Sequence, residues 1–420
     1  MIWDLNTPSS ASNVNGNEIV VELLKIGIVF FIILILTFRK VKLWISLLAG
    51  TFLLGFLFHL PLHTIVKDLF TSVIDSKTLL LIGALVTILF FSNLLKETGR
   101  MNAIMEGFGH VFKDIRVVIA LLPSMIGLIP IIGGALISAP MVVEGSDELK
   151  LSPERRTFIN YWFRHIWEYI LPTFPALILA AALIGIPIRR LIWVNLPLTL
   201  TAIASGIAVG FWGVSKSTRV KNDPDDPSIW KLTKNLLPLC FGLVLVVGFK
   251  VELTYAFGLT ILGMILFYRI EGRVVWKGFK QSVVLELLLT VIIVMGFKKV
   301  LESSQAISAV SATLSSSGIP RWLIAMLIPL LVGIMAGLTI APIAISFPIL
   351  IPFFQNDPHF LNYMVLAFAS GISGDLLSPF HLCLILTKDY FRADLKGVYR
   401  FIWMPTASIL MVALLMTFLR

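Results

Sequence analysis

The sequence has few charged residues: Asp, Glu, Lys and Arg make up 14% of its 420 positions, whereas 57% are hydrophobic. A soluble domain has about 25% charged residues, so this composition excludes an ordinary soluble protein. It predicts an all-α protein with many membrane-spanning helices. The two cysteines, Cys240 and Cys383, lie far apart within apolar runs. They give no support for a disulfide framework or for a metal-binding cysteine motif, and we expect two small buried hydrophobic side chains.

Enzyme motifs are also missing. The chain contains no His-Glu-x-x-His, no Gly-x-Ser-x-Gly and no phosphate-binding loop, which argues against an enzyme and against ATP-driven transport. The nearest pattern is Gly374-Asp375, the second half of the Gly-x-Gly-Asp motif of intramembrane aspartyl proteases. Ile372 stands where that motif requires glycine, and no Tyr-Asp partner lies on another apolar run. We therefore expect no enzymatic activity.

The formal net charge of +10 does not indicate a nucleic-acid partner. Lys and Arg lie mostly in short loops between apolar runs, where they set the orientation of helices in a lipid bilayer. The first seventeen residues contain no Lys or Arg, unlike a cleavable signal peptide with its basic start. We expect residues 1–17 to form a polar tail outside the membrane and the first hydrophobic helix to be retained.

Twelve apolar runs have lengths typical of membrane segments. They cover residues 19–38, 43–60, 78–96, 117–142, 157–184, 190–213, 231–249, 253–270, 282–300, 321–354, 360–387 and 399–419. Each run in the second set of six begins roughly 200 to 212 residues after the corresponding run in the first set. This spacing predicts an internal duplication. We expect repeat 1 at 18–213, a cytoplasmic connector at 214–230 and repeat 2 at 231–420.

Two of these runs, 117–142 and 321–354, contain several Pro and Gly residues. A continuous helix would be interrupted repeatedly, and irregular backbone at membrane depth is tolerated only inside the protein or along a cavity. We therefore predict two re-entrant helical hairpins. Their tips would lie near Gly133 and Gly134 and near 337–342.

The distribution of positive charge supports this prediction. If the hairpins do not cross the membrane, each repeat has five crossings, and the chain has about ten transmembrane helices. With the N-terminus outside, this arrangement places 23 Lys and Arg in inside loops and nine outside, whereas six crossings per repeat give 17 and 15. The positive-inside rule favours the hairpins. Five crossings invert the second repeat and place both termini outside, in a prokaryotic plasma membrane.

The runs 157–184 and 360–387 each carry a carboxylate four residues before a proline: Glu168 and Asp375. A carboxylate at mid-bilayer depth is costly and normally marks an ion or substrate path. The following proline removes a helix hydrogen bond at the same depth. We therefore predict two broken helices that carry the functional charges.

The surroundings of the two carboxylates differ. Asp375 is close in sequence to oxygen-bearing and flexible positions that suit Na⁺; these are Ser373, Gly374 and Ser378. Glu168 has His165 one turn earlier and Thr173 beside the break, which suits H⁺. The structural alternatives are that Arg164 neutralises Glu168 and that His165 and His381 serve in packing.

The segment GGALISAP at 133–140, the two broken helices and the duplicated layout resemble the integral-membrane family catalogued as domain of unknown function 401. That family is grouped with the ion transporter superfamily, which includes citrate, gluconate, dicarboxylate, arsenite and sodium/proton carriers. The resemblance implies a scaffold part, a transport part made from hairpins and broken helices, an elevator-like motion and, often, a homodimer. The Ser-Asn-Thr hairpin signature of the sodium/dicarboxylate members is absent, so a dicarboxylate substrate is not implied.

These observations predict a secondary active transporter that moves a small anion, most simply an organic acid, coupled to Na⁺ or H⁺ by alternating access. No other cofactor is expected. Asp375 and Glu168 would bind the coupling ion, and the hairpin tips would hold the anion through Gly133, Gly134, Ser138, Gly337 and Thr339. The alternative is a Na⁺/H⁺ antiporter, and more remote alternatives are a channel and an intramembrane aspartyl protease.

Overall fold

The computed structural model describes residues 16–112, 114–128, 134–217, 228–304 and 319–419, and every element in these ranges is an α-helix. This confirms the all-α prediction. The first ten helices are α1 (Gly16–Phe38), α2 (Leu43–Leu57), α3 (Leu62–Val73), α4 (Ser76–Glu97), α5 (Arg100–Val111), α6 (Ile115–Gly127), α7 (Ala135–Glu148), α8 (Pro153–His165), α9 (Pro175–Ile184) and α10 (Ile188–Phe211). The later helices are α11 (Ser228–Val247), α12 (Leu253–Phe267), α13 (Gly272–Ser282), α14 (Leu285–Ser303), α16 (Arg321–Ala336), α17 (Ala341–Phe354), α18 (Phe360–Leu376), α19 (Leu382–Phe391) and α20 (Leu395–Leu419).

Three helices in the described ranges, α4, α10 and α20, are long and apolar enough to cross a membrane. Several shorter helices are also apolar. Large hydrophobic side chains lie exposed along many of these helices, which is unfavourable in water and compatible with contact to lipid; examples are Phe31, Phe56, Trp193, Phe267 and Met411. The chain is therefore a helical protein whose apolar helices are compatible with a membrane.

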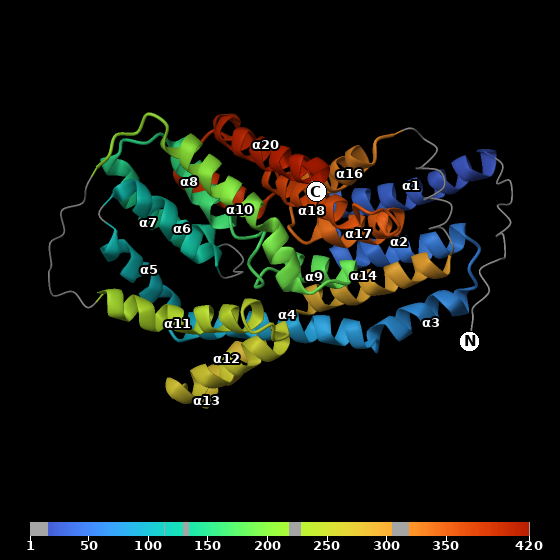
Figure 1. The fold of residues 1–420 in the computed structure, drawn as a ribbon, viewed down its shortest axis with the longest axis horizontal. Helices are drawn as coiled ribbons and strands as arrows, with labels where there is room; N and C mark the ends of the chain where they lie inside the picture. Colours follow the sequence, from blue (N-terminus) through green and yellow to red (C-terminus); the bar gives the residue numbers. More distant parts are fainter. Residues whose placement is uncertain (1–15, 113, 129–133, 218–227, 305–318, 420) are drawn as a thin grey trace.

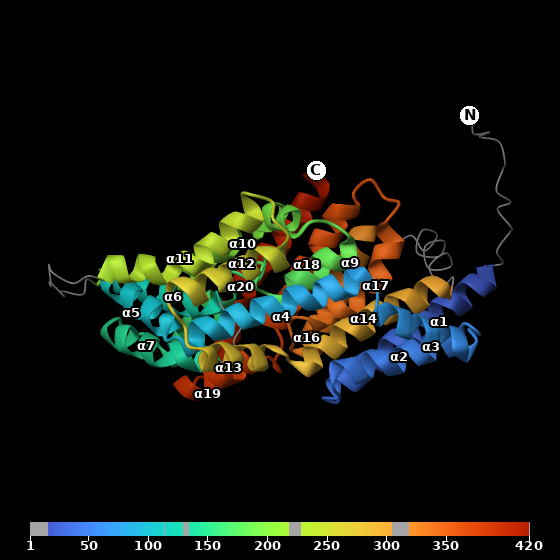
Figure 2. The ribbon, with the colours of Figure 1, turned by 90° about the horizontal axis from the view of Figure 1, so that it is seen from below.

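The contacts divide the helices into two groups. In one group α14 packs against α2 and α3, and α12 and α13 pack along α4. In the other group α16 packs against α18, α10 against α20, and α8 against α6, α19 and α20. Figure 1 shows α11, α12 and α13 along the lower edge, α8 and α20 along the upper edge, and α10 running diagonally toward the middle. Both views place α5, α6 and α7 at one end and α1, α2 and α3 at the other (Figure 1, Figure 2).

The sequence analysis did not predict the short helices α3, α5 and α13, whose residues it assigned to loops. The helices α3 and α13 show the reason. Both are amphipathic, with too many polar residues to form an apolar run. In α13, Gly278 packs against Phe90 and Leu94 of α4, while Lys277 forms an ion pair of 2.6 Å with Glu97 on the exposed surface. Such helices bury one face against the bundle and keep their charged face at the surface.

The interruption between α8 and α9 has a local cause. Ser152 caps α8 by accepting a hydrogen bond from the Arg155 N–H, and α8 ends at His165. Nine residues of turns follow before Pro175 starts α9. Pro172 and Pro175 both lack an N–H group, so a regular helix cannot continue through this segment. Residues 166–174 are called the first break.

A second interruption separates α18 from α19. Helix α18 ends at Leu376, and α19 begins at Leu382 with His381 as its capping residue. Pro379 lies between them and disfavours helical backbone at the residue before it. Residues 377–381 are called the second break. Each break is associated with one of the two carboxylates. Glu168 lies inside the first break, and Asp375 lies just before the second, in the last turn of α18.

Candidate functional site

The two breaks are in contact with each other inside the protein. The hydroxyl group of Tyr161, on α8, donates a hydrogen bond of 3.1 Å to the Leu376 carbonyl at the end of α18. The Tyr161 ring also packs against the rings of His165 and His381, with centroid distances of 4.7 and 5.4 Å. Both histidines are buried. Two segments more than 200 residues apart therefore form one polar site.

Four titratable side chains form a continuous chain across this contact. The Glu168 Oε1 atom lies 3.9 Å from His165 Nε2, and His165 Nε2 lies 3.2 Å from His381 Nε2. His381 Nδ1 then lies 2.9 Å from Asp375 Oδ1, at ion-pair distance but without a well-aligned hydrogen bond. The exposed fraction of Glu168 is 4% and that of Asp375 is 0%. This series of side chains links the two predicted carboxylates, Glu168 and Asp375, through two imidazole rings.

These distances limit where protons can be placed. The Tyr161 carbonyl can only accept, so His165 Nδ1, at 2.6 Å, must carry a proton and donate it. The two Nε2 atoms at 3.2 Å can share a single proton, since one must donate and the other accept. His165 Nδ1 therefore carries a proton, and at most one further proton lies between the two Nε2 atoms.

The hairpin formed by α16 and α17 holds the second break. Thr339, in the turn between them, donates a hydrogen bond of 2.9 Å to Asp375 Oδ2. The Ser378 hydroxyl donates one of 2.6 Å to the Ile334 carbonyl of α16. Gly337 ends α16 with φ 61°, and a Cβ atom there would lie 2.8 Å from the Phe380 carbonyl carbon. Only glycine fits this left-handed position without strain.

The first break is held in a similar way by α6. The Thr173 hydroxyl donates a hydrogen bond of 3.1 Å to the Leu128 carbonyl, and Trp167 Nε1 donates one of 3.0 Å to the Ser124 carbonyl. The side-chain amide of Asn160, on α8, donates a hydrogen bond of 2.9 Å to the carbonyl of Ala135, where α7 begins. The guanidinium group of Arg164 lies against Gly134, because a Cβ atom on that glycine would be 2.9 Å from Arg164 Nη2.

The contact between α16 and α18 requires glycine on both helices. A Cβ atom on Gly333 would collide with the Gly371 carbonyl oxygen and lie 2.6 Å from the Asp375 amide nitrogen. A Cβ atom on Gly374 would collide with the Leu330 carbonyl oxygen. Because the clashing atoms are backbone, a methyl group must push the helices apart. This close approach fixes the depth of Asp375 relative to the hairpin.

We expect Gly333→Ala to destabilise the protein by about 1–3 kcal/mol, the usual cost of overpacking a core. The measurement is the thermal unfolding midpoint of purified protein. Gly263→Ala is the matched control, because a Cβ atom on Gly263, in α12, meets nothing within 4 Å. Equal unfolding midpoints for the two variants would contradict the packing argument.

The structure gathers several of the predicted site residues around the second break, namely Asp375, Ser373, Ser378, Gly337 and Thr339. It gathers Glu168, His165 and Thr173 around the first break. Gly374 packs closely against α16, where a Cβ atom would collide with the Leu330 carbonyl oxygen, and Gly133 lies outside the described residues. The Ser138 hydroxyl donates to the Ala135 carbonyl within its own helix, at 3.3 Å, so nothing places it at the chain of titratable groups.

Sequence reasoning expected Cys240 and Cys383 to be buried; the structure confirms this for Cys383, but Cys240 is exposed on α11, so that expectation was wrong. Packing was one alternative for His381, and nothing in the local sequence pairs it with His165, 216 residues away. In the structure the ligand atoms of His165, His381 and Cys383 all lie within 4.8 Å of one another, and the three residues are buried. One feature of the sequence could have placed His381 and Cys383 near the site: both lie within five positions of Pro379, the proline that follows Asp375.

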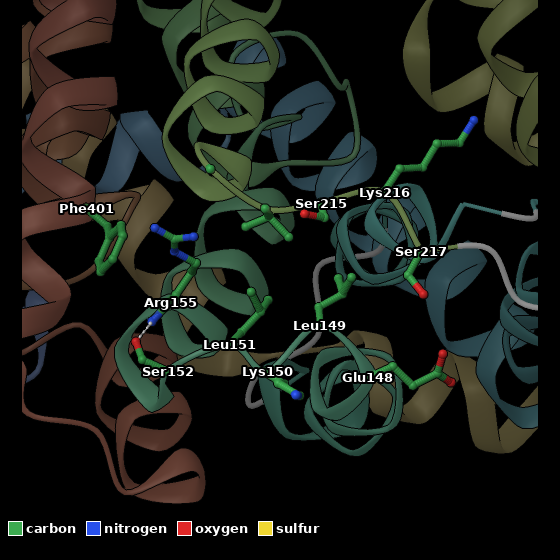
Figure 3. A pocket seen from close by; sticks show the side chains of 12 residues that line it. Glu148, Leu149, Lys150, Leu151, Ser152, Arg155, Ser215, Lys216, Ser217 and Phe401 are labelled. Carbon is green, nitrogen blue, oxygen red and sulfur yellow. Dashed lines mark hydrogen bonds between the residues drawn. The ribbon is translucent and has the colours of Figure 1, made fainter.

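Three of the pockets lie near these elements. One of about 420 Å³ borders the first break and is lined in part by Ser124, Ile166 and Trp167. Another of about 480 Å³ is lined by Lys150, Ser152, Arg155, Lys216 and Phe401 among others (Figure 3). Arg155 is ten residues before His165 on α8, which corresponds to about 15 Å, so this basic pocket is separate from the breaks.

The third pocket, of about 460 Å³, lies next to the second break. It is lined partly by Gly337, Phe380 and Leu382, together with residues 40–44 ahead of and at the start of α2. It therefore reaches the hairpin turn that contacts Asp375.

The chain was compared with known families and proteins. No curated protein matches it. A family model described as "Protein of unknown function (DUF401)" matches residues 22–419, a range that contains both breaks and all four members of the titratable chain. Because the match extends over nearly the whole sequence, the chain belongs to the DUF401 family of proteins of unknown function.

Proposed function

We propose that the protein is a secondary active transporter that moves a small anion, most simply an organic acid, coupled to Na⁺ or H⁺. The observation that carries this proposal is the buried chain of Glu168, His165, His381 and Asp375 across two interrupted helices. Ionisable groups are expensive inside a membrane protein and are normally kept where an ion or substrate passes. Interrupted helices add free backbone groups at the same place.

Equivalent contacts in the two parts of the chain support an internal duplication. A Cβ atom on Gly127 would collide with the Arg164 carbonyl oxygen, and one on Gly333 would collide with the Gly371 carbonyl oxygen. The first glycine ends α6 and the second lies near the end of α16. The partners belong to α8 and α18, the two helices that lead into the breaks. In our proposal the two repeats are inverted, and the site lies at their interface.

The two contact groups of helices fit a scaffold and a transport part. The hairpin helices and the broken helices pack mainly on one another and on α10 and α20, whereas α2, α3, α4, α12, α13 and α14 form the other group. We propose about ten crossings and two re-entrant hairpins in a prokaryotic plasma membrane, with both termini outside. Movement of the transport part against the scaffold would supply alternating access.

The neighbourhood of the breaks suits an anion as well as a coupling ion. Helices α9 and α19 begin at the breaks, and the N-terminal ends of helices favour negative charge. The guanidinium group of Arg164 lies at Gly134, where α7 begins. The pocket at Gly337 and Phe380 gives a route toward the second break. A small anion could thus be held between the hairpin turns while Asp375 and Glu168 handle the cation.

We expect an organic anion to raise the unfolding midpoint of the purified protein by mass action, since a ligand that binds only the folded state stabilises it. A panel of organic acids and oxyanions is screened with Na⁺ or K⁺ and over a range of pH. The proposal expects a larger shift when the coupling ion is present. A chloride series at matched ionic strength is the control for non-specific salt effects.

The same screen distinguishes the antiporter. If no anion shifts the midpoint while Na⁺ alone does so in a pH-dependent way, the protein exchanges Na⁺ for H⁺ through Glu168 and Asp375. If neither anions nor Na⁺ nor pH alters stability or flux in proteoliposomes, a coupled transporter of either kind is contradicted.

A further inference from the structure

We propose that His165, His381 and Cys383 bind one transition-metal ion of the borderline class, with Zn²⁺ as the expected occupant. The site would lie where the two breaks meet. It goes beyond the proposed transport function and does not depend on it. The three ligand atoms come from α8, from the second break and from the first turn of α19.

The spacing of the two imidazole nitrogens fits a shared metal ion. Zn²⁺ binds histidine nitrogen at about 2.0–2.1 Å in tetrahedral geometry, which places two bound nitrogens about 3.3 Å apart. The Nε2 atoms of His165 and His381 are 3.2 Å apart. Cys383 supplies the third atom, because its Sγ lies within 4.8 Å of one ring nitrogen of each histidine. Small side-chain movements would bring all three to bonding distance from a common centre.

Each histidine is oriented through its other ring nitrogen. His165 Nδ1 donates to the Tyr161 carbonyl at 2.6 Å, and His381 Nδ1 faces Asp375 Oδ1 at 2.9 Å. Metal-binding histidines usually contact a backbone carbonyl or a carboxylate in this way, which fixes the ring and leaves the other nitrogen for the metal. Both histidines thus present Nε2 to the same point.

The donor set selects the class of ion. Thiolate and imidazole ligands suit Zn²⁺ and similar ions, whereas Na⁺ and Mg²⁺ require oxygen. Cys383 lies in the first turn of α19, where free N–H groups stabilise a thiolate. Glu168 is available as a fourth ligand, since its Oε1 is 3.9 Å from His165 Nε2 and its buried Oε2 has no hydrogen-bond partner among the described residues.

Metal and proton compete for the same atoms. The ion would take the place of the proton shared by the two Nε2 atoms, and the Cys383 thiol would release its proton on binding. Metal binding should therefore weaken at low pH. If the transport proposal also holds, a bound ion would link the two breaks and block their movement.

The test uses the full chain, purified in detergent without a histidine tag and stripped with a chelator. Co²⁺ is added as a spectroscopic probe, and Zn²⁺ binding is measured by calorimetry. We expect one Co²⁺ per chain with a thiolate-to-cobalt charge-transfer band, displaced by one Zn²⁺. Cys383→Ser should remove the band and weaken Zn²⁺ binding at least about tenfold, a usual effect of losing a metal-site contact.

Cys240→Ser is the matched control, because Cys240 is exposed on α11 and lies outside the cluster. A second ligand variant is His381→Gln. Its matched control is His359→Gln, because His359 is exposed. Thermal unfolding of each variant without metal identifies any variant that fails to fold. If His381→Gln fails to fold, the comparison of Cys383→Ser with Cys240→Ser decides the proposal. The proposal is overturned if wild type binds neither ion, or if Cys383→Ser and Cys240→Ser bind identically. Neither result involves flux, so the transport proposal is judged separately.

Discussion

Asp375→Asn is expected to abolish coupled transport while leaving the protein folded. The change removes the charge of a fully buried carboxylate with almost no change of shape. Asn can still accept the hydrogen bond from Thr339 through its amide oxygen, so the hairpin contact is kept. It cannot alternate between a charged and a protonated form, and this alternation is what coupling to H⁺ or Na⁺ requires. Flux of the coupling ion and of the anion into proteoliposomes is the measurement.

Asp389→Asn is the matched control for this variant. Asp389 is an exposed carboxylate on α19 that pairs with its neighbour Lys388, and exposed pairs of this kind contribute little to stability. We expect its flux to equal that of wild type. Near-normal flux in Asp375→Asn would remove Asp375 from the coupling mechanism, whatever the outcome for the other carboxylate.

Glu168→Gln is expected to have an effect of similar size, with flux falling to the level of empty liposomes. Glu168 lies in the first break, and its Oε2 has no hydrogen-bond partner among the described residues. A buried carboxylate that is not satisfied by the fold costs stability, so replacing it with a neutral amide should not lower the unfolding midpoint. A loss of function without a loss of stability identifies a functional charge.

The structural alternative predicts the opposite pattern for Glu168. If Glu168 serves mainly to balance Arg164, removing its charge leaves a buried cation without compensation and destabilises the fold by several kcal/mol. Glu168→Gln would then unfold at lower temperature while the folded fraction still transports. Glu302→Gln, at the exposed end of α14, controls for loss of one negative charge elsewhere in the chain.

The sequence located both carboxylates because proline chemistry is local. Pro172 and Pro379 remove backbone donors wherever they stand, and the helices end within a few residues of Glu168 and Asp375. The crowded Pro and Gly residues of 321–354 likewise indicated two short helices, and α16 and α17 are joined by the turn at Gly337. The amphipathic helices α3 and α13 were missed because an apolar-run criterion does not detect a helix with one polar face.

By itself, then, the sequence determined that the chain is helical and apolar, and where its helices are interrupted, since these depend on composition and on neighbouring residues. Only the tertiary structure decided which groups meet at the interruptions. His165 and His381 lie 216 positions apart and come within 3.2 Å because α19 packs against α8. Cys383 joins them for the same reason. Long-range packing creates such a cluster, and no local pattern of residue types records it.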